Sequence, residues 1–375
     1  MTLPESRFGG AEPRVAPAGG IGRWFGIGVF LMLLAVTVTA FLPVNYVILE
    51  PGPITNVLGR VSTGEHKGDP VLVPTGATAY PAQGALFFTT VREIGSPQAK
   101  PTLLEVASSW LSSDNEIVPM SQIYPEGVPQ QQIVDGNTAM MDNSQSVATA
   151  TALRAAGWNV PDRIVIQGFP EDSPNQDVLK SGDEFVSING TGVPTLDQLT
   201  AAIRETTAGE DLTAQIRRDG TPLTVTLHTK ESEGHTVVGV LLGITYDFPV
   251  QVKINIEHVS GPSAGLMLSL GIYDVLTPGS LTGDHQIAGT GTLADDGVVG
   301  PIGGIAQKLV GARNGGARYF LAPRANCDEV AGHIPDGLTV VAVDSFDQAL
   351  ADVRSIAGGD TSTLPSCSAA LASPS

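Results

Sequence analysis

The sequence predicts an α+β protein with one N-terminal transmembrane helix, a β-rich module and an α/β domain. An uncharged apolar run spans residues 24–42, and short strands separated by turns fill residues 160–231. Over residues 232–357, strands alternate with helices, a pattern typical of a domain in which helices cover a sheet. The remaining residues form a leading tail, a connecting region and a flexible tail, over residues 1–23, 43–159 and 358–375.

The apolar run of residues 24–42 has the length of a membrane span, because about 20 apolar helical residues cross a hydrocarbon core. Arginines precede the run, whereas Arg60 is the one basic residue among the twenty that follow it. The positive-inside rule therefore places residues 1–23 in the cytoplasm and the rest of the chain outside it. Two alternatives stay open: a signal peptide cleaved near Val38-Thr39-Ala40, which also exports the chain, and a buried core helix.

Composition and charge exclude several kinds of partner. The chain has 20 Lys and Arg against 38 Asp and Glu, a net charge of −18. Because nucleic acid requires a basic surface, we expect no nucleic-acid partner. Cys327 and Cys367 lack a CxxC pattern or a histidine cluster, so no metal site is predicted. Outside the cytoplasm they would form a disulfide that ties the tail to the last domain; the alternative is two unpaired thiols.

The β-rich module is predicted from short apolar runs between strong turn sequences. Ile164–Ile166 and Phe185–Ile188 are strand candidates, and Asn189-Gly190 is a turn. A helix follows over Leu196–Glu205, and the Asp219-Gly220 turn joins two further strands as a hairpin.

The elements of the α/β domain follow from periodicity. A buried strand is predicted over Val237–Thr245, and apolar residues alternate with polar ones from Val250 to Ile256. Helices are predicted over Gly261–Leu276, Ile305–Asn314 and Ser345–Ile356, and the last strands over Tyr319–Ala322 and Thr339–Val343. Upstream of the module, Gly84–Val91 is a predicted strand and Thr138–Gly157 a predicted helix.

Ser263 is the candidate nucleophile of the sequence. It lies in the run Ser260-Gly261-Pro262-Ser263-Ala264-Gly265, before an apolar helix. Pro262 suits a first helical turn, which places Ser263 among free backbone N–H groups that would stabilise an oxyanion. Gly261 and Gly265 leave room for a substrate backbone. Taken alone, the run fits a helix cap better, because a serine near a helix start is more often a cap.

Lys308 is the candidate general base, since none of the six histidines lies in a recognisable triad motif. On the predicted helix it borders an apolar stripe, so its stem would run against the core. Burial lowers a lysine pKa by desolvating the ammonium, and a fall of roughly 3 units would make it a base near neutral pH. A surface lysine with a partly covered stem is the alternative.

The runs GPSAGL, GTGTLADDGVVGPIGGIAQK and ARNGGARYFLAP occur in this order and resemble the proteolytic domain of the Lon family of Ser-Lys peptidases. The resemblance implies that Ser263 is the acylated nucleophile and Lys308, 45 residues later, the general base. Ala288 stands where Lon carries a threonine that orients the lysine, and Thr290 or Thr292 would take over that role.

Residues 160–231 resemble a PDZ domain through LKSGDEFVSINGTGV and the helix and hairpin that follow. The resemblance implies that the helix Leu196–Glu205 borders a groove that takes a peptide by strand addition. No Gly-hydrophobic-Gly loop precedes Ile164, which argues against capture of a free C-terminus. The alternative is a small β-sandwich that serves only packing.

Together these features resemble the membrane-anchored, ATP-independent, PDZ-containing Lon-like proteases of bacteria. No GxxxxGK[ST] loop is present, so we expect neither a nucleotide nor another cofactor. The resemblance implies a PDZ module inserted in the peptidase, so that residues 43–159 belong with the C-terminal domain outside the cell membrane. It further implies peptide or unfolded protein substrates, exported or membrane-associated, and a ring of six copies. A non-catalytic anchored scaffold that binds peptides is the alternative.

Overall fold

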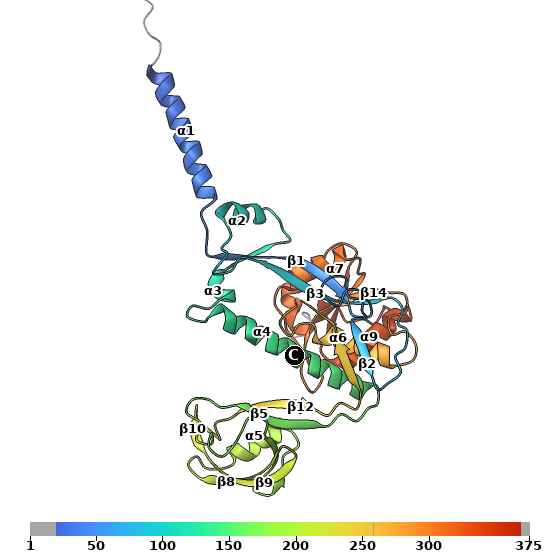
Figure 1. The fold of residues 1–375 in the computed structure, drawn as a ribbon. Coiled ribbons are helices and arrows are strands. Elements are labelled where there is room, and N and C mark those ends of the chain that lie inside the picture. Colours follow the sequence, from blue (N-terminus) through green and yellow to red (C-terminus); the bar gives the residue numbers. More distant parts are fainter. Residues whose placement is uncertain (1–19, 258, 369–375) are drawn as a thin grey trace, which may run out of the picture. The chain divides into compact units, whose positions relative to one another are not determined.

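The computed structural model describes residues 20–257 and 259–368, with side chains from Trp24 onward (Figure 1). Residues 1–19 of the expected cytoplasmic tail and 369–375 of the expected flexible tail lie outside the described residues. Contacts divide the chain into two units. Unit 1 comprises Met1–Ile48 and Glu93–Glu126, and unit 2 comprises Leu49–Arg92 and Gly127–Ser375.

Unit 1 consists mainly of helices. Its elements are α1 (Gly20–Ala40), α2 (Leu103–Ser109), β4 (Glu116–Pro119) and α3 (Met120–Ile123). Helix α2 begins with a capping box: the Thr102 hydroxyl accepts from the Glu105 N–H, and the Glu105 carboxylate accepts from the Thr102 N–H. Two orphan donors of the first turn are thereby satisfied.

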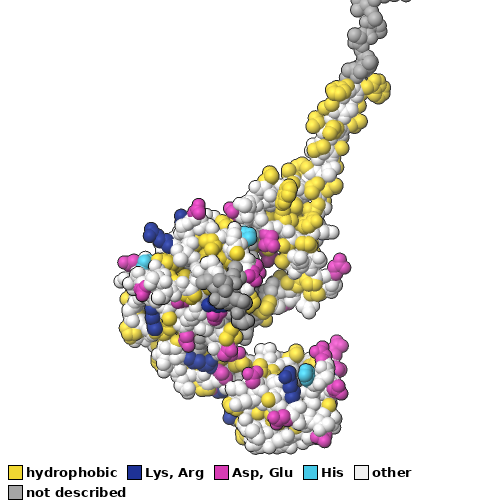
Figure 2. Space-filling view, turned by 180° about the vertical axis from the view of Figure 1, so that it is seen from behind, with side chains coloured by type: hydrophobic (Ala, Val, Ile, Leu, Met, Phe, Trp, Pro, Cys, Tyr) yellow, Lys and Arg dark blue, Asp and Glu magenta, His cyan; other side chains and the backbone are white. Residues whose placement is uncertain are grey.

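Helix α1 forms over most of the apolar run, and its apolar side chains are exposed (Figure 2). Within the described residues, no helix combines the length and the apolar character that crossing a bilayer demands. The helix has 21 residues and ends at Ala40, before the predicted end at Leu42. The predicted transmembrane helix over residues 24–42 is therefore not supported.

Unit 2 contains a sheet in the order β18-β17-β14-β3-β1. Strands β3, β14, β17 and β18 are parallel to one another. Two short antiparallel pairs, β2 with β13 and β15 with β16, lie outside this sheet. The bounds are β1 (Tyr46–Asn56), β2 (Leu72–Thr75), β3 (Ala85–Ile94), β13 (Gln251–Ile254), β14 (Gln286–Gly289), β15 (Thr292–Leu293), β16 (Val299–Gly300), β17 (Tyr319–Pro323) and β18 (Thr339–Val343).

Helices pack on both faces of this sheet, because successive strand residues point to opposite sides. Ile287 of β14 packs with the cluster of α4, α6 and α9, whereas Ala288, its neighbour in sequence, packs with the cluster of α7 and α8. The helices are α4 (Gln130–Ala155), α6 (Gly265–Leu276), α7 (Ile305–Asn314), α8 (Cys327–Val330) and α9 (Phe346–Ala357), with a 3-10 turn η1 (Arg324–Asn326).

The β-rich module has its own sheet, in the order β12-β5-β6-β8-β9, and its own core around Leu199 and Ile216. Asn189, Gly190, Asp219 and Gly220 all adopt positive φ, as the tight hairpin turns predicted there require. The elements are β5 (Asp162–Gly168), β6 (Glu184–Ile188), β7 (Thr191–Gly192), α5 (Leu196–Arg204), β8 (Asp211–Arg218), β9 (Thr221–His228), β10 (Lys230–Ser232), β11 (His235–Val237) and β12 (Leu241–Tyr246).

The largest differences from the predicted boundaries concern β12, α4 and α6. Strand β12 pairs with β5, so the module extends past residue 231 to Tyr246, and the single strand predicted over Val237–Thr245 is divided in two. Helix α4 begins at Gln130, eight residues before the predicted Thr138. Helix α6 begins at Gly265 rather than Gly261, because Gly261 adopts a positive φ that a helix excludes.

The segments on either side of the module come together in unit 2. Strand β3 pairs in parallel with β14, and α4 packs against α6 in the main core (Figure 1). The strand and the helix upstream of the module thus belong structurally with the C-terminal domain, as the resemblance implied.

Candidate active site

The structure brings Ser263 and Lys308 together. Ser263 lies just before helix α6, and Lys308 lies in the first turns of α7. The Lys308 Nζ is 2.9 Å from the Ser263 Oγ and 3.1 Å from the Thr290 Oγ1. A base within hydrogen-bond reach of a hydroxyl, held by a third group, is the geometry of an activated nucleophile.

Lys308 is buried, with 4% of its surface exposed. Helix α7 places it among Ile305, Leu309 and Ala312, all in the core. Both Nζ partners are neutral hydroxyls, so they leave the ammonium charge uncompensated. Desolvation by burial therefore lowers the pKa of Lys308 from 10.5 to about 8, which makes the neutral amine accessible near physiological pH.

Thr290 contacts both Lys308 and Ser263. Its hydroxyl is fully buried, accepts from the Lys308 Nζ and donates to the Ser263 carbonyl at 3.0 Å. Thr292, the other threonine considered, lies in β15 against Gly300 instead. Ala288 is buried within β14. Of the two sequence candidates, the structure thus places Thr290 at the lysine.

The residues around Ser263 form a tight loop rather than a helical turn. Ala264 is the N-cap of α6, so Ser263 precedes the helix. The Ser263 carbonyl also accepts from the Gly291 N–H at 2.9 Å. In the described part of the chain, the N–H groups of Ser263 and Ala264 donate to no protein acceptor. Pro262 has no N–H, so these two groups are the donors free to hold an oxyanion.

The two loop glycines have different surroundings. Gly261 has a φ of +83° and open space where a side chain would stand. Gly265 is crowded, because a Cβ there would lie 2.8 Å from the Ser144 Oγ. Gly261 thus leaves space next to the nucleophile, whereas Gly265 allows helix α4 to approach the loop closely.

Cys327 and Cys367 form a disulfide, as one of the two sequence alternatives predicted. Both are buried in the cluster that packs behind α7, at 2% and 3% exposed. The bond therefore holds residues 358–367 of the expected flexible tail near the domain. Its role is structural.

Known proteins match this architecture in two segments. Residues 250–354 match the Lon protease (S16) C-terminal proteolytic domain, and residues 140–229 match the PDZ domain. The chain contains a Lon-type proteolytic domain and a PDZ domain. Together with the mixed α+β fold, these matches support a serine protease.

Individual known proteins are similar to parts of this chain. The Lon protease of Nitratidesulfovibrio vulgaris is 36% identical over 140 residues, which cover 33% of this chain and 17% of that protein. Lon protease 2 of Bacillus subtilis is 32% identical over 95 residues, 25% of this chain and 17% of that protein. The chain thus spans about a sixth of the length of these relatives. The solved PDZ domain of an SdrC-like protein from Listeria monocytogenes is 17% identical, has a TM-score of 0.20, and covers 21% of this chain and 85% of that chain.

The PDZ sheet has an unpaired edge that the sequence did not indicate. Strand β12 pairs with β5 on one side, and its other side has no partner strand within the described residues (Figure 1). The strand begins inside the run Gly239-Val240-Leu241-Leu242-Gly243, at Leu241. No Gly-hydrophobic-Gly run precedes Ile164, whereas this one lies at the C-terminal end of the domain.

Sequence reasoning also missed Ser144 and Asn137 of helix α4. The Ser144 hydroxyl donates to the Pro262 carbonyl at 2.9 Å, and the Asn137 carbonyl accepts from the Gly261 N–H at 3.1 Å. Ser144 and Pro262 are 118 residues apart, with the PDZ domain between them. No local pattern could have connected them.

Proposed function

We propose that the protein is an ATP-independent serine endopeptidase in which Ser263 and Lys308 form the catalytic dyad. The observation that carries the proposal is the 2.9 Å contact between the Ser263 Oγ and a buried lysine whose pKa is lowered to about 8. A lysine with a purely structural role would normally have an exposed ammonium or a carboxylate partner. Lys308 instead is buried, and its ammonium contacts a serine hydroxyl.

Each step of the reaction has a residue in place for it. Neutral Lys308 takes the proton of Ser263 as the Oγ attacks the peptide carbonyl. The N–H groups of Ser263 and Ala264 hold the oxyanion. Protonated Lys308 then gives the proton to the leaving amine, and a water activated by the same lysine hydrolyses the acyl-enzyme. Thr290 keeps the lysine pointed at Ser263 throughout.

The substrate in this proposal is an extended peptide or an unfolded segment. The sequence has no GxxxxGK[ST] loop that would bind ATP for unfolding. The unpaired edge of β12 would take a peptide by strand addition. Backbone pairing at that edge gives affinity with little demand on sequence, which suits delivery of varied segments.

We further propose that the protein acts outside the cytoplasm. The Cys327–Cys367 disulfide supports this, because such bonds persist in oxidising compartments. Protein isolated from its native cells and then unfolded in urea, so that both buried cysteines are exposed, should resist thiol alkylation until it is reduced. Alkylation of both cysteines without reductant would contradict the compartment.

The dyad is tested with Ser263→Ala and Lys308→Met, assayed on a fluorogenic peptide and on an unfolded protein. Both variants should lose activity. Lys308→Met should also unfold at higher urea concentration, because it removes a buried charge that costs on the order of 3 kcal/mol at pH 7. Lys253→Met, at an exposed position of the same domain, is the matched control and should keep full activity.

Retained cleavage in either purified dyad variant would overturn the assignment. If wild-type protein neither cleaves nor becomes acylated at Ser263 but still binds peptides, the non-catalytic scaffold is the correct interpretation.

A further inference from the structure

Helix α4 holds the loop that carries the nucleophile. The Ser144 hydroxyl donates to the Pro262 carbonyl, and the Asn137 carbonyl accepts from the Gly261 N–H. Ser144 is 3% exposed, and the missing side chain of Gly265 lets its hydroxyl approach. Two residues of one helix thus fix the loop just before Ser263.

The Ser144 contact also sets the direction of a catalytic donor. Pro262 and Ser263 share a planar trans peptide, in which the C=O and the N–H point in opposite directions. A hydrogen bond that fixes the Pro262 carbonyl therefore fixes the Ser263 N–H, one of the two donors proposed for the oxyanion. Ser144 is a positioning residue for this step.

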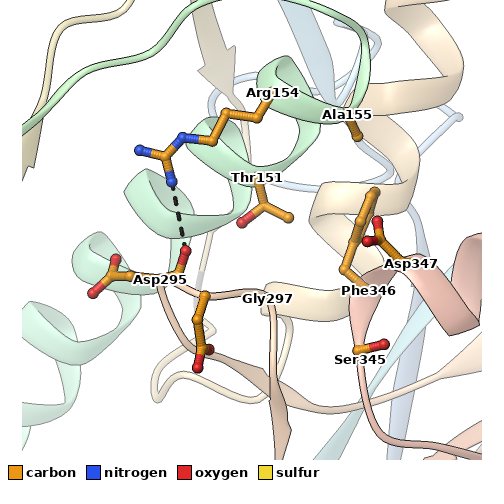
Figure 3. Close-up of a pocket in the computed structure, with 9 residues that line it drawn as sticks. Thr151, Arg154, Ala155, Asp295, Gly297, Ser345, Phe346 and Asp347 are labelled. Carbon is orange, nitrogen blue, oxygen red and sulfur yellow. Dashed lines mark hydrogen bonds between the residues drawn. The ribbon is translucent and has the colours of Figure 1, made fainter.

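The other end of α4 contacts the residues where the chain enters and leaves the PDZ domain. Arg154 lies ten residues beyond Ser144, about 15 Å along the helix. Its guanidinium forms an ion pair with Asp162 and lies over the ring of Tyr246, 5.5 Å from the centroid. The Tyr246 hydroxyl donates to the Asp295 carboxylate, and Arg154 donates to the Asp295 carbonyl at 3.5 Å (Figure 3). We call Arg154, Asp162, Tyr246 and Asp295 the latch.

The latch includes one residue from each of the two chain segments that connect the PDZ domain to the proteolytic domain. Asp162 is the first residue of β5 and Tyr246 the last of β12, and the two are paired in register. Strand β12 is the one whose free edge is proposed to take a peptide. A peptide that adds to β12 therefore acts on a strand whose end contacts Arg154.

The latch is also connected through the chain to Thr290, which contacts Lys308. Asp295 lies in the turn between β15 and β16, five residues after Thr290. The latch also borders a pocket of about 310 Å³, whose lining includes Thr151 and Phe346 (Figure 3). Arg154 and Asp295 consequently have space on one side and are not locked in place by packing.

We infer that helix α4 relays the state of the PDZ domain to Ser263, with the latch at one end and Ser144 as the positioning residue at the other. Peptide pairing with β12 would alter the latch contacts and so the Pro262–Ser263 peptide. This inference rests on the proposed peptidase function, and it makes the PDZ domain a regulator of the dyad as well as a docking site.

The test compares two tyrosine-to-phenylalanine variants on a fluorogenic tripeptide, which is too short to reach both sites. Tyr246→Phe removes the latch hydroxyl and should lower kcat by roughly fivefold or more with KM little changed, because only transition-state geometry is affected. Tyr273→Phe is the matched control: Tyr273 also lies under an arginine, Arg354, at 5.5 Å, but its hydroxyl accepts from Arg354 and not from a latch residue. It should keep wild-type kcat.

A double variant tests whether the latch acts through Ser144. Ser144→Ala should lower kcat, Ser144→Thr should restore it, and Tyr246→Phe should add little in the Ser144→Ala background. The inference would be overturned if folded Tyr246→Phe kept the wild-type kcat. It would also be overturned if the fold-reduction in kcat of the double variant equalled the product of the two single fold-reductions. If Tyr246→Phe does not fold, Asp295→Asn provides the same comparison. Wild-type protein that is no more active than Ser263→Ala would instead refute the peptidase function itself.

Discussion

The charge state of a single amine controls the proposed chemistry. Lys308 can accept the serine proton only when it is neutral, and burial lowers its pKa to about 8. The neutral fraction therefore rises as the pH passes upward through 8. We expect kcat/KM to increase about tenfold per pH unit below pH 8 and to level off above it, as for any reaction that needs one deprotonated group.

This profile is measured on a peptide without titratable groups, with enzyme returned to pH 7 afterwards to show that it stayed folded. A midpoint near pH 6.5 would indicate a histidine base, and a rate that falls with rising pH would exclude a neutral amine.

At the scale of residues, the sequence predicted the pair that the structure brings into contact, Ser263 and Lys308, but not which threonine contacts the lysine. Ser263 and Lys308 stand in specific flanking motifs, so the resemblance assigned them by position. Thr290 and Thr292 are two residues apart, and on one extended strand they would point to the same face. The chain instead ends β14 at Gly289 and begins β15 at Thr292, which separates their directions. Only the fold distinguishes them.

Helix α6 offers a comparison between two crowded glycines. An alanine Cβ at Gly265 would lie 2.8 Å from the Ser144 Oγ, and one at Gly271 would lie 2.5 Å from the Val57 Cγ2. Overpacking of this kind typically costs about 1–3 kcal/mol. Gly265→Ala should in addition displace Ser144 from the Pro262 carbonyl and lower kcat by about tenfold or more. Gly271→Ala should lose stability but keep kcat.

Urea unfolding and steady-state kinetics of the two variants provide the check. Equal kcat values in variants of similar stability would show that contact between α4 and the nucleophile loop does not influence catalysis.

At the scale of elements, most helices and strands followed from periodicity, and the misplaced ones depend on distant contacts. Helix α7 and strand β18 have the predicted bounds. Strand β12 was assigned to the wrong domain, because its apolar pattern fits either sheet and only its pairing with β5 decides. Helix α6 starts late because Gly261 lies in a turn held by α4 from the other side of the PDZ insertion.

The whole molecule shows why topology was harder to predict than the site. The proteolytic domain is assembled from segments on both sides of the PDZ domain: β3 and α4 come before it, and β14 and α6 after it. Each segment lacks a complete apolar core alone, and periodicity cannot tell which partner covers it. The resemblance to PDZ-containing Lon-like proteases supplied the insertion, and the parallel pairing of β3 with β14 shows it directly.

The Cys327–Cys367 disulfide should contribute to the stability of this assembled domain. It joins residues separated by 40 positions, and restricting an unfolded loop of that length is worth about 4 kcal/mol in the chain-entropy model. The bond also keeps the segment before Cys367 on β18, where the Pro365 carbonyl accepts from the Ala342 N–H at 2.8 Å.

A variant with both Cys327→Ser and Cys367→Ser should therefore lose about 2–4 kcal/mol of unfolding free energy, measured as a lower midpoint in urea. A reductant should destabilise wild-type protein equally and leave the double variant unchanged. The dyad lies in other elements, so cleavage of a short peptide at 25 °C should persist in the variant. An unfolding midpoint that neither reductant nor substitution shifts would mean that the bond does not form in solution.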